Sequence, residues 1–287
     1  MSSRRVSAVL RDAASRLEES GVASPDHDAA ELLAHVLGTT RSRLPLVDDP
    51  GADQVAEFGA LVERRAAREP LQHLTGLAGF RHTELKVGPG VFVPRPETEL
   101  LAGWAIEAAQ QVLGESGRAP VVVDLCTGSG AIARSLAQEV PEARVYAVEL
   151  DEGAHAWATQ NLAGTGVELR HGDMADAFDD LAGTVDVVVC NPPYIPLEAW
   201  ETVAAEARDH DPHLALFSGD DGLDAMRVLE RRAAVLLRPR GVVGAEHADV
   251  QGLAAPQVFV DAGRWSDVRD HLDLAGRARY LTARLAR

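Results

Sequence analysis

Cysteines, long apolar runs and metal-ligand patterns are all scarce in this 287-residue chain. Its two cysteines, Cys126 and Cys190, are too few for a disulfide scaffold or a cysteine-built zinc site, and they indicate a reducing, cytoplasmic environment. No apolar run approaches the roughly 20 residues of a membrane helix, and none follows the charged Met1–Arg5 as a secretory signal requires. The ten histidines are scattered without metal-ligand spacing. We therefore expect a cytoplasmic protein with no membrane segment and no metal.

Basic residues are also in deficit, because 28 lysines and arginines face 44 acidic residues and give a formal net charge of −16. Proteins that hold a nucleic-acid backbone usually carry a basic excess or a basic stripe, so we expect no direct nucleic-acid binding. Only one lysine (Lys86) and two asparagines (Asn161 and Asn191) are present, which indicates a bias toward GC-rich codons. An asparagine kept against that bias is a candidate functional residue.

Hydrophobic residues make up 46% of the chain, enough for a globular core, and their spacing predicts three regions. Residues 1–75 read as a small helical domain, with helical spacing in Val6–Leu17 and Ala29–Leu37, a start signal at Ser24-Pro25 and a third helix over Ala52–Arg68. Residues 76–96 carry glycines around the apolar runs Leu85–Val87 and Val91–Val93, which predicts a β-hairpin linker. Residues 97–287 form the third region.

The third region opens with a helix over Glu97–Leu113 and then alternates strands with helices. The predicted strands are Val121–Leu125, Arg144–Glu149, Val167–Arg170, Val185–Cys190 and Gly241–Glu246. Near-continuous apolar strands in such an alternation predict an α/β domain whose parallel sheet is covered on both faces. The tail, Val258–Arg287, predicts a final helix and a strand pair.

A glycine-rich turn, Asp124-Leu125-Cys126-Thr127-Gly128-Ser129-Gly130, ends the first strand, and a helix opens directly after it. Its glycines let the backbone approach a ligand closely, and the helix N-terminus offers unpaired N–H groups. Glu149 ends the second strand, where a carboxylate can accept hydrogen bonds from both hydroxyls of a ribose. Together these features predict a nucleoside-containing ligand, with Asp173 and Met174 after the third strand placed to reach adenine.

The fourth strand runs into the tetrapeptide Asn191-Pro192-Pro193-Tyr194. Asn191 Oδ1 and the Pro192 carbonyl can each accept one N–H of a planar –NH2 group, while Tyr194 fixes the plane of the substrate. The nitrogen of such a group is a poor nucleophile because its lone pair is delocalised. Aligning that lone pair with the methyl of a sulfonium cofactor is then the main source of rate, and the proton can leave late without a dedicated base.

Together these elements resemble the class I S-adenosylmethionine-dependent methyltransferases, and more narrowly the release-factor glutamine N5-methyltransferases of the HemK/PrmC type. The resemblance covers nearly the whole chain, and its distinguishing stretches are Glu69–Gly76, Phe92–Glu99, Asp124–Gly130, Asn191–Tyr194 and Ser218–Leu223. It implies a Rossmann-like domain with a mostly parallel seven-stranded sheet, a helical N-terminal domain that helps to dock the substrate, and a hairpin between them.

The resemblance also implies the roles of the site residues. Cys126, Thr127, Gly128, Ser129 and Gly130 would wrap the methionine part of S-adenosylmethionine, Glu149 would contact the ribose, and Asp173 and Met174 the adenine. Asn191 would also belong to the cofactor-binding residues. Asn191 and Pro192 would hold the glutamine amide of the Gly-Gly-Gln motif in a class-1 peptide chain release factor, with Pro193 and Tyr194 shaping the slot. We expect the enzyme to be a monomer. The sequence departs from the family pattern at Cys126, where glycine is common, and at Glu149, where aspartate is.

Four alternatives are open from the sequence. A sister enzyme that methylates a glutamine of a ribosomal protein would use the same catalytic residues. A DNA adenine N6-methyltransferase would also grip a planar –NH2 group, but the charge of −16 and the lack of a basic target-recognition segment weigh against it. A dehydrogenase would fit the glycine-rich turn, but it would leave Asn191–Tyr194 without a role. A non-catalytic protein-binding module would leave both the cofactor-binding and the amide-holding residues without a role.

Overall fold

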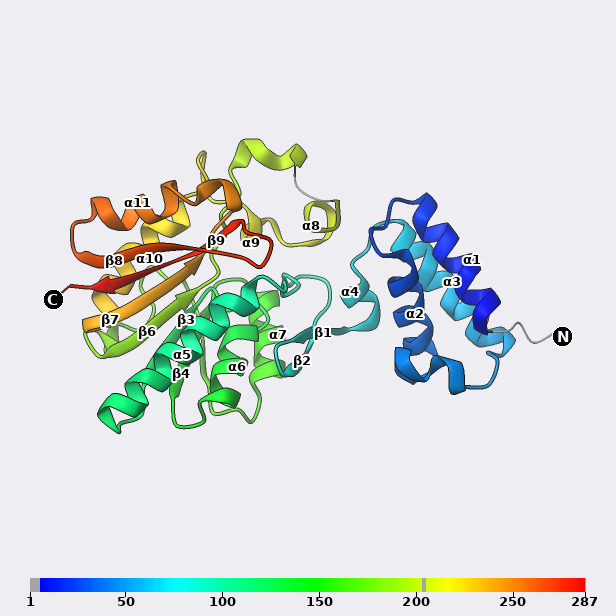
Figure 1. Cartoon of the computed structure of the whole chain (residues 1–287), viewed down its shortest axis with the longest axis horizontal. Helices are drawn as coiled ribbons and strands as arrows, with labels where there is room; N and C mark the ends of the chain where they lie inside the picture. The colour runs from blue at the N-terminus through cyan, green and yellow to red at the C-terminus, as the bar shows by residue number, and fades with distance from the viewer. Residues whose placement is uncertain (1–5, 203–204, 287) are drawn as a thin grey trace. The chain divides into compact units, whose positions relative to one another are not determined.

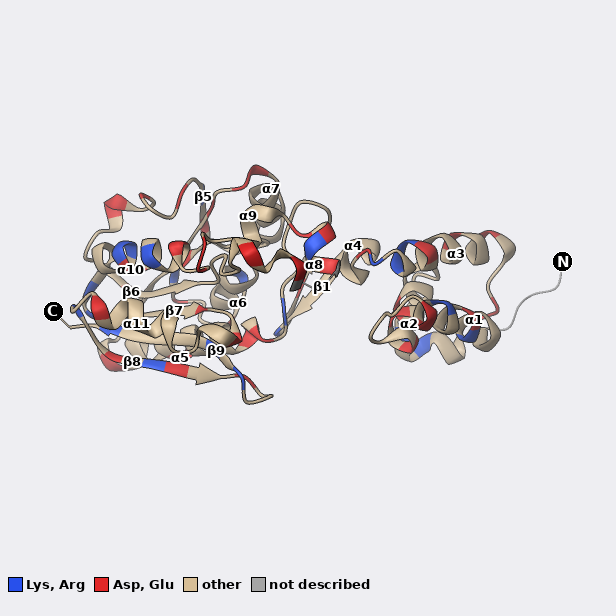
Figure 2. Cartoon of the chain, turned by 90° about the horizontal axis from the view of Figure 1, so that it is seen from above, with Lys and Arg blue, Asp and Glu red and all other residues tan. Residues whose placement is uncertain are grey.

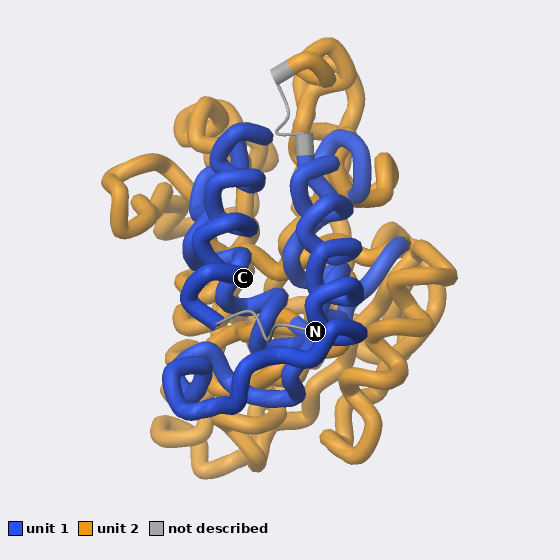
Figure 3. Tube along the Cα trace, turned by 90° about the vertical axis from the view of Figure 1, so that its right-hand side faces the viewer, with its two compact units in different colours: residues 1–77, 87–89, 204–210 blue, residues 78–86, 90–203, 211–287 orange. Residues whose placement is uncertain are grey.

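The computed structural model describes residues 6–202 and 205–286, and the chain forms two compact units (Figure 3). The first unit comprises residues 1–77, 87–89 and 204–210, and the second comprises residues 78–86, 90–203 and 211–287. Met1–Arg5, from which we expect no secretory signal, lie outside the described residues. No helix in residues 6–202 and 205–286 is long and apolar enough to cross a membrane.

The first unit is a helical bundle whose core is one cluster of mostly aliphatic side chains, including the fully buried Leu17, Leu32 and Leu33. Its helices are α1 (Val6–Glu19), α2 (Pro25–Val36), η1 (Arg41–Leu46), α3 (Ala52–Ala66), α4 (Leu71–Thr75) and α8 (Ala205–His210). Pro25 opens α2 as predicted. α3 ends two residues before the predicted Arg68, because Arg68 adopts a left-handed backbone with φ +72° that cannot continue a helix.

An ion-pair network, buried at Arg65 and Asp28 and partly buried at Glu206 and Arg68, holds α8 within the first unit. The guanidinium of Arg65, on α3, lies 2.8 Å from Asp28 and 3.1 Å from Glu206, the second of these on α8. Arg68 adds a second cation 2.7 Å from Glu206. Buried charges need such pairing, because a carboxylate left alone in the core would lose its hydration without compensation. These contacts assign α8, which lies far from the other helices of this unit in the sequence, to the first unit.

A two-stranded hairpin is formed by β1 (Leu77–Phe80) and β2 (Thr83–Lys86), and all of it except Leu77 belongs to the second unit. The prediction that Val91–Val93 takes part in it is wrong. That segment is not a strand, although Val91 and Val93 are buried. Pro89, Pro94 and Pro96 flank it, and each proline removes a backbone donor that strand pairing would need.

The main sheet of the second unit has seven strands in the order β5-β4-β3-β6-β7-β9-β8 (Figure 1). The first five strands in this order are parallel, and β9 pairs antiparallel with both β7 and β8. The strands are β3 (Val121–Leu125), β4 (Arg144–Glu149), β5 (Glu168–His171), β6 (Val185–Cys190), β7 (Leu237–Glu246), β8 (Trp265–Leu272) and β9 (Ala278–Leu285). The predicted α/β class, the parallel strands and the terminal strand pair are confirmed.

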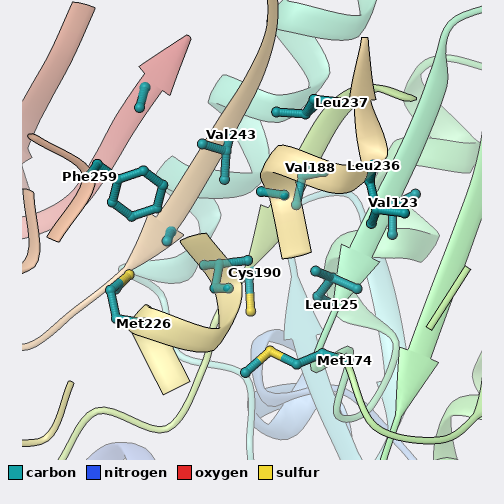
Figure 4. Close-up of a cluster of buried hydrophobic side chains, with 14 of the residues drawn as sticks. Val123, Leu125, Met174, Val188, Cys190, Met226, Leu236, Leu237, Val243 and Phe259 are labelled. Carbon is teal, nitrogen blue, oxygen red and sulfur yellow. The ribbon is translucent and has the colours of Figure 1, made fainter. Parts of the chain in front are cut away.

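Helices cover both faces of this sheet, with α5 to α7 on one side and α10 and α11 on the other (Figure 1). The helices of this unit are α5 (Thr98–Ser116), α6 (Ala131–Glu139), α7 (Glu152–Leu162), α9 (His213–Leu216), α10 (Asp224–Leu236) and α11 (Ala254–Asp261). Short 3-10 turns are η2 (Asp179–Leu181), η3 (Leu197–Thr202) and η4 (Asp249–Gln251). On the α10 side, side chains of alternate strand positions such as Val188 and Val243 form one apolar cluster with Met226 and Phe259 (Figure 4).

The strand order fixes where a ligand can bind. From β3 the chain continues outward through β4 and β5, whereas β6 returns to the other side of β3. In open α/β sheets, ligands bind outside the carboxyl ends of neighbouring strands whose connections leave in opposite directions. We call this edge between β3 and β6 the crevice. The glycine-rich turn follows β3 and the tetrapeptide follows β6, so both predicted motifs lie at this crevice.

Candidate functional site

The fully buried Asp124 stabilises the glycine-rich turn by hydrogen bonds within it and to the helix that follows. Asp124 Oδ2 accepts hydrogen bonds from Thr127 Oγ1 at 2.6 Å and from the Ala133 backbone N–H at 3.2 Å. The turn needs left-handed backbone at Cys126, Gly128 and Gly130, with φ of +59°, +58° and +84°. For Cys126, which has a Cβ, this conformation costs about 1–2 kcal/mol. A Cβ placed on Gly128 would meet open space, so a ligand can approach the backbone there.

Glu149, at the end of β4, faces the same turn. Its Oε2 accepts from the Gly128 backbone N–H at 2.8 Å, and its Oε1 accepts from the Asp151 N–H at 2.9 Å. Burial raises the pKa of Glu149, while these backbone donors oppose the shift. The predicted acid and the predicted turn are therefore in direct contact, and a carboxylate already ordered by two N–H groups is preorganised for further donors such as hydroxyls.

The two carboxyl groups at the glycine-rich turn, those of Asp124 and Glu149, favour a ligand that brings hydrogen-bond donors or positive charge. Burial raises the pKa of Asp124 to about 7, against the opposing bonds from Thr127 and Ala133. Asp124 Oδ1 is buried and has no hydrogen-bond partner within the described part of the chain. A buried acceptor without a partner carries a desolvation cost that a cationic ligand would relieve.

Asp173 and Met174 lie beyond β5 at the same edge. Asp173 is exposed, and its Oδ1 accepts from the Ala175 backbone N–H at 2.8 Å. Met174 is buried, with its sulfur 3.5 Å from the Cys126 sulfur, and belongs to the apolar cluster that contains Cys190 (Figure 4). Met174 therefore supports the turn from the core side. A contact of either residue with adenine stays a prediction.

The tetrapeptide starts beside the turn. Leu125 and Cys190 are paired in the β3–β6 register, so the next residues, Cys126 and Asn191, leave neighbouring strand ends together. Asn191 Nδ2 donates to Thr98 Oγ1 at 3.3 Å. Pro192 is buried, and Pro193 is half-buried. The structure thus brings the nucleoside-site and amide-site residues predicted from sequence to one crevice.

Tyr194 is held at both of its ends. Its hydroxyl donates to Glu246 Oε1 at 3.2 Å, and burial together with that carboxylate raises the pKa of Tyr194. Its backbone carbonyl accepts from Gln251 Nε2 at 3.0 Å, and the same nitrogen lies 3.4 Å from the Gly222 carbonyl. Gln251 therefore links the tetrapeptide to Ser218–Leu223, one of the stretches that carry the family resemblance.

Four residues around the tetrapeptide were not predicted as site residues: Thr98, Glu246, Gln251 and Arg279. Arg279 belongs with them because its positive charge lowers the pKa of Glu246. Thr98 lies in the Phe92–Glu99 stretch of the family resemblance, which was the signal for it. A signal existed for Glu246, because it is a carboxylate ending a predicted buried strand, as Glu149 is.

Asn161, the other of the two asparagines in the chain, supports the glycine-rich turn. Its side chain bonds both backbone groups of Lys86 at 2.8 and 2.9 Å and the Ser129 carbonyl at 2.9 Å, so it ties β2 to the turn.

Residues 6–202 and 205–286 contain no cluster of three or more histidine, cysteine, aspartate or glutamate side chains that could hold a metal ion. The polar groups that the structure places at the carboxyl ends of β3, β4 and β6 are mostly hydrogen-bond acceptors. Carbonyl and amide oxygens dominate at Asn191–Tyr194, and carboxylates dominate around the turn.

Comparison with known protein families gives two matches. Residues 8–76 match the model described as PrmC N-terminal domain, and residues 122–210 match a methyltransferase domain. The hMettl16 catalytic domain, a solved structure, superposes with a TM-score of 0.51 at 16% identity over 70% of this chain and 75% of that one. At this identity the likeness concerns the fold alone.

Curated relatives align over nearly the full length. The release factor glutamine methyltransferase of Streptomyces coelicolor is 57% identical over 97% of this chain and 98% of its own. That of Mycolicibacterium smegmatis is 46% identical over 99% of both chains. A 4-amino-L-phenylalanine/4-methylamino-L-phenylalanine methyltransferase of Streptomyces pristinaespiralis is 46% identical over 73% of this chain and 71% of its own.

Proposed function

Since the chain belongs to the release factor glutamine methyltransferases, we propose that its tetrapeptide holds the glutamine amide of a release factor for methylation. The substrate in this proposal is the glutamine of the Gly-Gly-Gln motif in a class-1 peptide chain release factor, modified at the side-chain nitrogen N5 in the cytoplasm. The β3–β6 register carries the proposal, because it sets Asn191 beside Cys126 at the crevice. The amide-holding group and the glycine-rich turn then face one ligand space.

S-adenosylmethionine is the methyl donor in this proposal, and it supplies an electrophilic methyl group on a positively charged sulfur. Cys126, Thr127, Gly128, Ser129 and Gly130 would hold its methionine part. The open space over Gly128 and the unpartnered buried Oδ1 of Asp124 support that assignment. Glu149 would accept from the ribose hydroxyls, and Asp173 and Met174 would flank the adenine.

The chain's own residues would supply alignment and no proton relay. Asn191 Oδ1 and the Pro192 carbonyl would each accept one N–H of the glutamine amide, which aims the nitrogen lone pair along the line of transfer. Pro193 and Tyr194 would form the walls of the slot. Holding the reacting atoms in line can supply several kcal/mol of the barrier reduction, and the proton leaves the methylated nitrogen afterwards.

We propose a division of labour along the chain that follows the predicted boundaries. Residues 1–75 would help to dock the release factor, residues 76–96 would act as a linker, and residues 97–287 would carry out the transfer. The match of residues 8–76 to a family-specific domain, while residues 122–210 match methyltransferases in general, supports this division.

Other planar –NH2 groups are the competing substrates. The relative from Streptomyces pristinaespiralis is named for an aromatic amine, and a ribosomal-protein glutamine would meet the same acceptors. DNA adenine is disfavoured by the net charge of −16, and acidic residues occur on elements of both units (Figure 2).

The test is methyl transfer from labelled S-adenosylmethionine to a panel of substrates in parallel. The panel contains a purified class-1 release factor, the same factor with its Gly-Gly-Gln glutamine changed, a ribosomal-protein fraction, 4-amino-L-phenylalanine and duplex DNA. We expect label on the intact factor alone. Label on another member of the panel, with none on the intact factor, would overturn the proposed substrate.

Changing Glu149 to alanine should weaken binding of S-adenosylmethionine by about 1.5–3 kcal/mol, as expected for a lost hydrogen bond to a charged group. That is a roughly 10- to 150-fold rise in Kd, measurable by calorimetry. Glu152→Ala, which removes an exposed carboxylate from the first turn of α7, is the matched control and should leave Kd unchanged. Equal Kd values for both variants would contradict the ribose contact.

A further inference from the structure

One buried carboxylate joins three segments of the second unit behind the tetrapeptide. Glu246, at the end of β7, is 1% exposed, and its Oε2 accepts from Thr98 Oγ1 at 2.7 Å. Its Oε1 accepts from the Tyr194 hydroxyl at 3.2 Å. Thr98, the first residue of α5, is 4% exposed, so its hydroxyl has little access to water. The amide of Asn191 completes the chain of bonds at 3.3 Å from Thr98 Oγ1.

The direction of these bonds follows from the carboxylate. An ionised carboxylate only accepts, so the hydroxyls of Thr98 and Tyr194 must both donate to it. Because the single hydroxyl hydrogen of Thr98 is used in the bond to Glu246, the Thr98 oxygen can only accept from Asn191. An asparagine amide has one donating end and one accepting end. The end that faces Thr98 must therefore be Nδ2, and Oδ1 is turned the other way.

We propose that Thr98 and Glu246 are positioning residues for the methyl transfer, because they hold the Asn191 amide with Oδ1 toward the substrate. This inference rests on the proposed function, in which Oδ1 accepts an N–H of the glutamine. With the amide reversed, Nδ2 would face the substrate nitrogen, and donor would meet donor. The same carboxylate anchors the Tyr194 ring, so one buried charge orders both ends of the tetrapeptide.

The neighbours of Glu246 decide whether its carboxyl group is ionised. Burial raises the pKa of Glu246 to about 7, and nearby Glu97 adds to the rise. The Thr98 bond, the positive charge of Arg279 on β9 and the Tyr194 bond oppose it. Arg279 is itself held by Asp273 at 3.3 Å. Each partner that stabilises the charged form also stabilises the bond direction required at Asn191.

The test is a double-mutant cycle on the enzyme as it exists, with kcat and KM for the release factor and Kd for S-adenosylmethionine. Thr98→Val keeps the shape of the side chain and removes the hydroxyl. We expect kcat to fall by about 10- to 100-fold, the scale of a misaligned reacting group, with Kd unchanged. Thr98→Ser, which restores the hydroxyl, should recover most of the loss.

The decisive comparison is made in the Asn191→Ala background, under single-turnover conditions with enzyme in excess. A residue that acts only through Asn191 has nothing left to position there, so adding Thr98→Val should change the rate by less than about twofold. Multiplied losses in the double variant would overturn the inference, as would normal turnover of Thr98→Val.

Two further variants separate positioning from general damage. Thr282→Val removes another buried threonine hydroxyl, which lies 2.8 Å from His271 Nε2, and should leave kcat unchanged. Glu246→Gln, nearly isosteric but able to donate, should lower kcat as Thr98→Val does. A wild-type enzyme that methylates no release factor would contradict the proposed function, whereas an active wild type with an equally active Thr98→Val variant contradicts only the positioning role.

Discussion

Replacement of Asn191 with alanine is expected to lower kcat for release-factor methylation by about 10²- to 10³-fold, the scale seen when one preorganised hydrogen-bonding group is removed from an active site. The loss should appear in kcat, because the proposed role of Asn191, which follows β6, is to align the nucleophile. The Kd for S-adenosylmethionine should stay within about twofold, since the Gly128–Glu149 contact on the other strands is untouched.

Single-turnover methyl transfer and calorimetry on the same preparation measure both quantities. Gln160→Ala is a suitable control, because it removes an exposed amide side chain from α7 and should change neither value. Turnover of Asn191→Ala at the wild-type rate would contradict the amide-holding mechanism. A large rise in Kd with unchanged kcat would instead move Asn191 from the substrate side to the cofactor side of the crevice.

Replacement of Gly222 with alanine is expected to damage the site almost as strongly. Gly222 has φ +74°, and a Cβ there would lie 2.4 Å from the Tyr194 carbonyl oxygen and 2.8 Å from Gln251 Nε2. Real Cβ atoms do not approach backbone oxygen so closely, so the tetrapeptide or the Ser218–Leu223 segment must move. The hydrogen bond from Gln251 to the Tyr194 carbonyl would then be lost, and we expect kcat to fall by about 100-fold.

Gly183→Ala separates the clash from backbone strain. Gly183 also has a left-handed backbone, with φ +68°, but nothing lies within 4 Å of a Cβ built there. Both variants should lose about 1–2 kcal/mol of unfolding free energy from the strained conformation. Only Gly222→Ala should lose activity, measured as kcat alongside urea unfolding. Equal activity of the two variants would contradict a role for close packing behind Tyr194.

Much of the fold was predictable because its signals lie within short stretches of chain. Val121–Leu125, Arg144–Glu149 and Val185–Cys190 are strands at the predicted bounds, since runs of buried β-branched residues favour that state locally. The hairpin was predicted with the wrong second strand. Val91–Val93 has the residue types of a strand, but the neighbouring prolines prevent its pairing.

The candidate site also has a part that was predictable from local sequence and a part that was not. Asp124–Gly130 and Asn191–Tyr194 are contiguous, so the residue types and their order carry the chemistry without knowledge of the fold. Thr98 and Glu246 are separated by 148 positions. Each has a local signal, Thr98 in the Phe92–Glu99 stretch and Glu246 at the end of a buried strand, but neither signal pairs one with the other. Nothing within either stretch specifies the other as a partner.

The amino-acid sequence alone was sufficient for the fold class, the family and the location of the two candidate-site motifs in the chain, because these depend on local periodicity, glycine-rich turn chemistry and contiguous motifs. The buried bonds that set the direction of the Asn191 amide, and the close approach of Gly222 to Tyr194, required the folded chain. They depend on β6 lying between β3 and β7 and on α5 beginning over the end of that sheet. Such neighbours are set by the packing of distant segments, in which many weak apolar contacts add up to one arrangement.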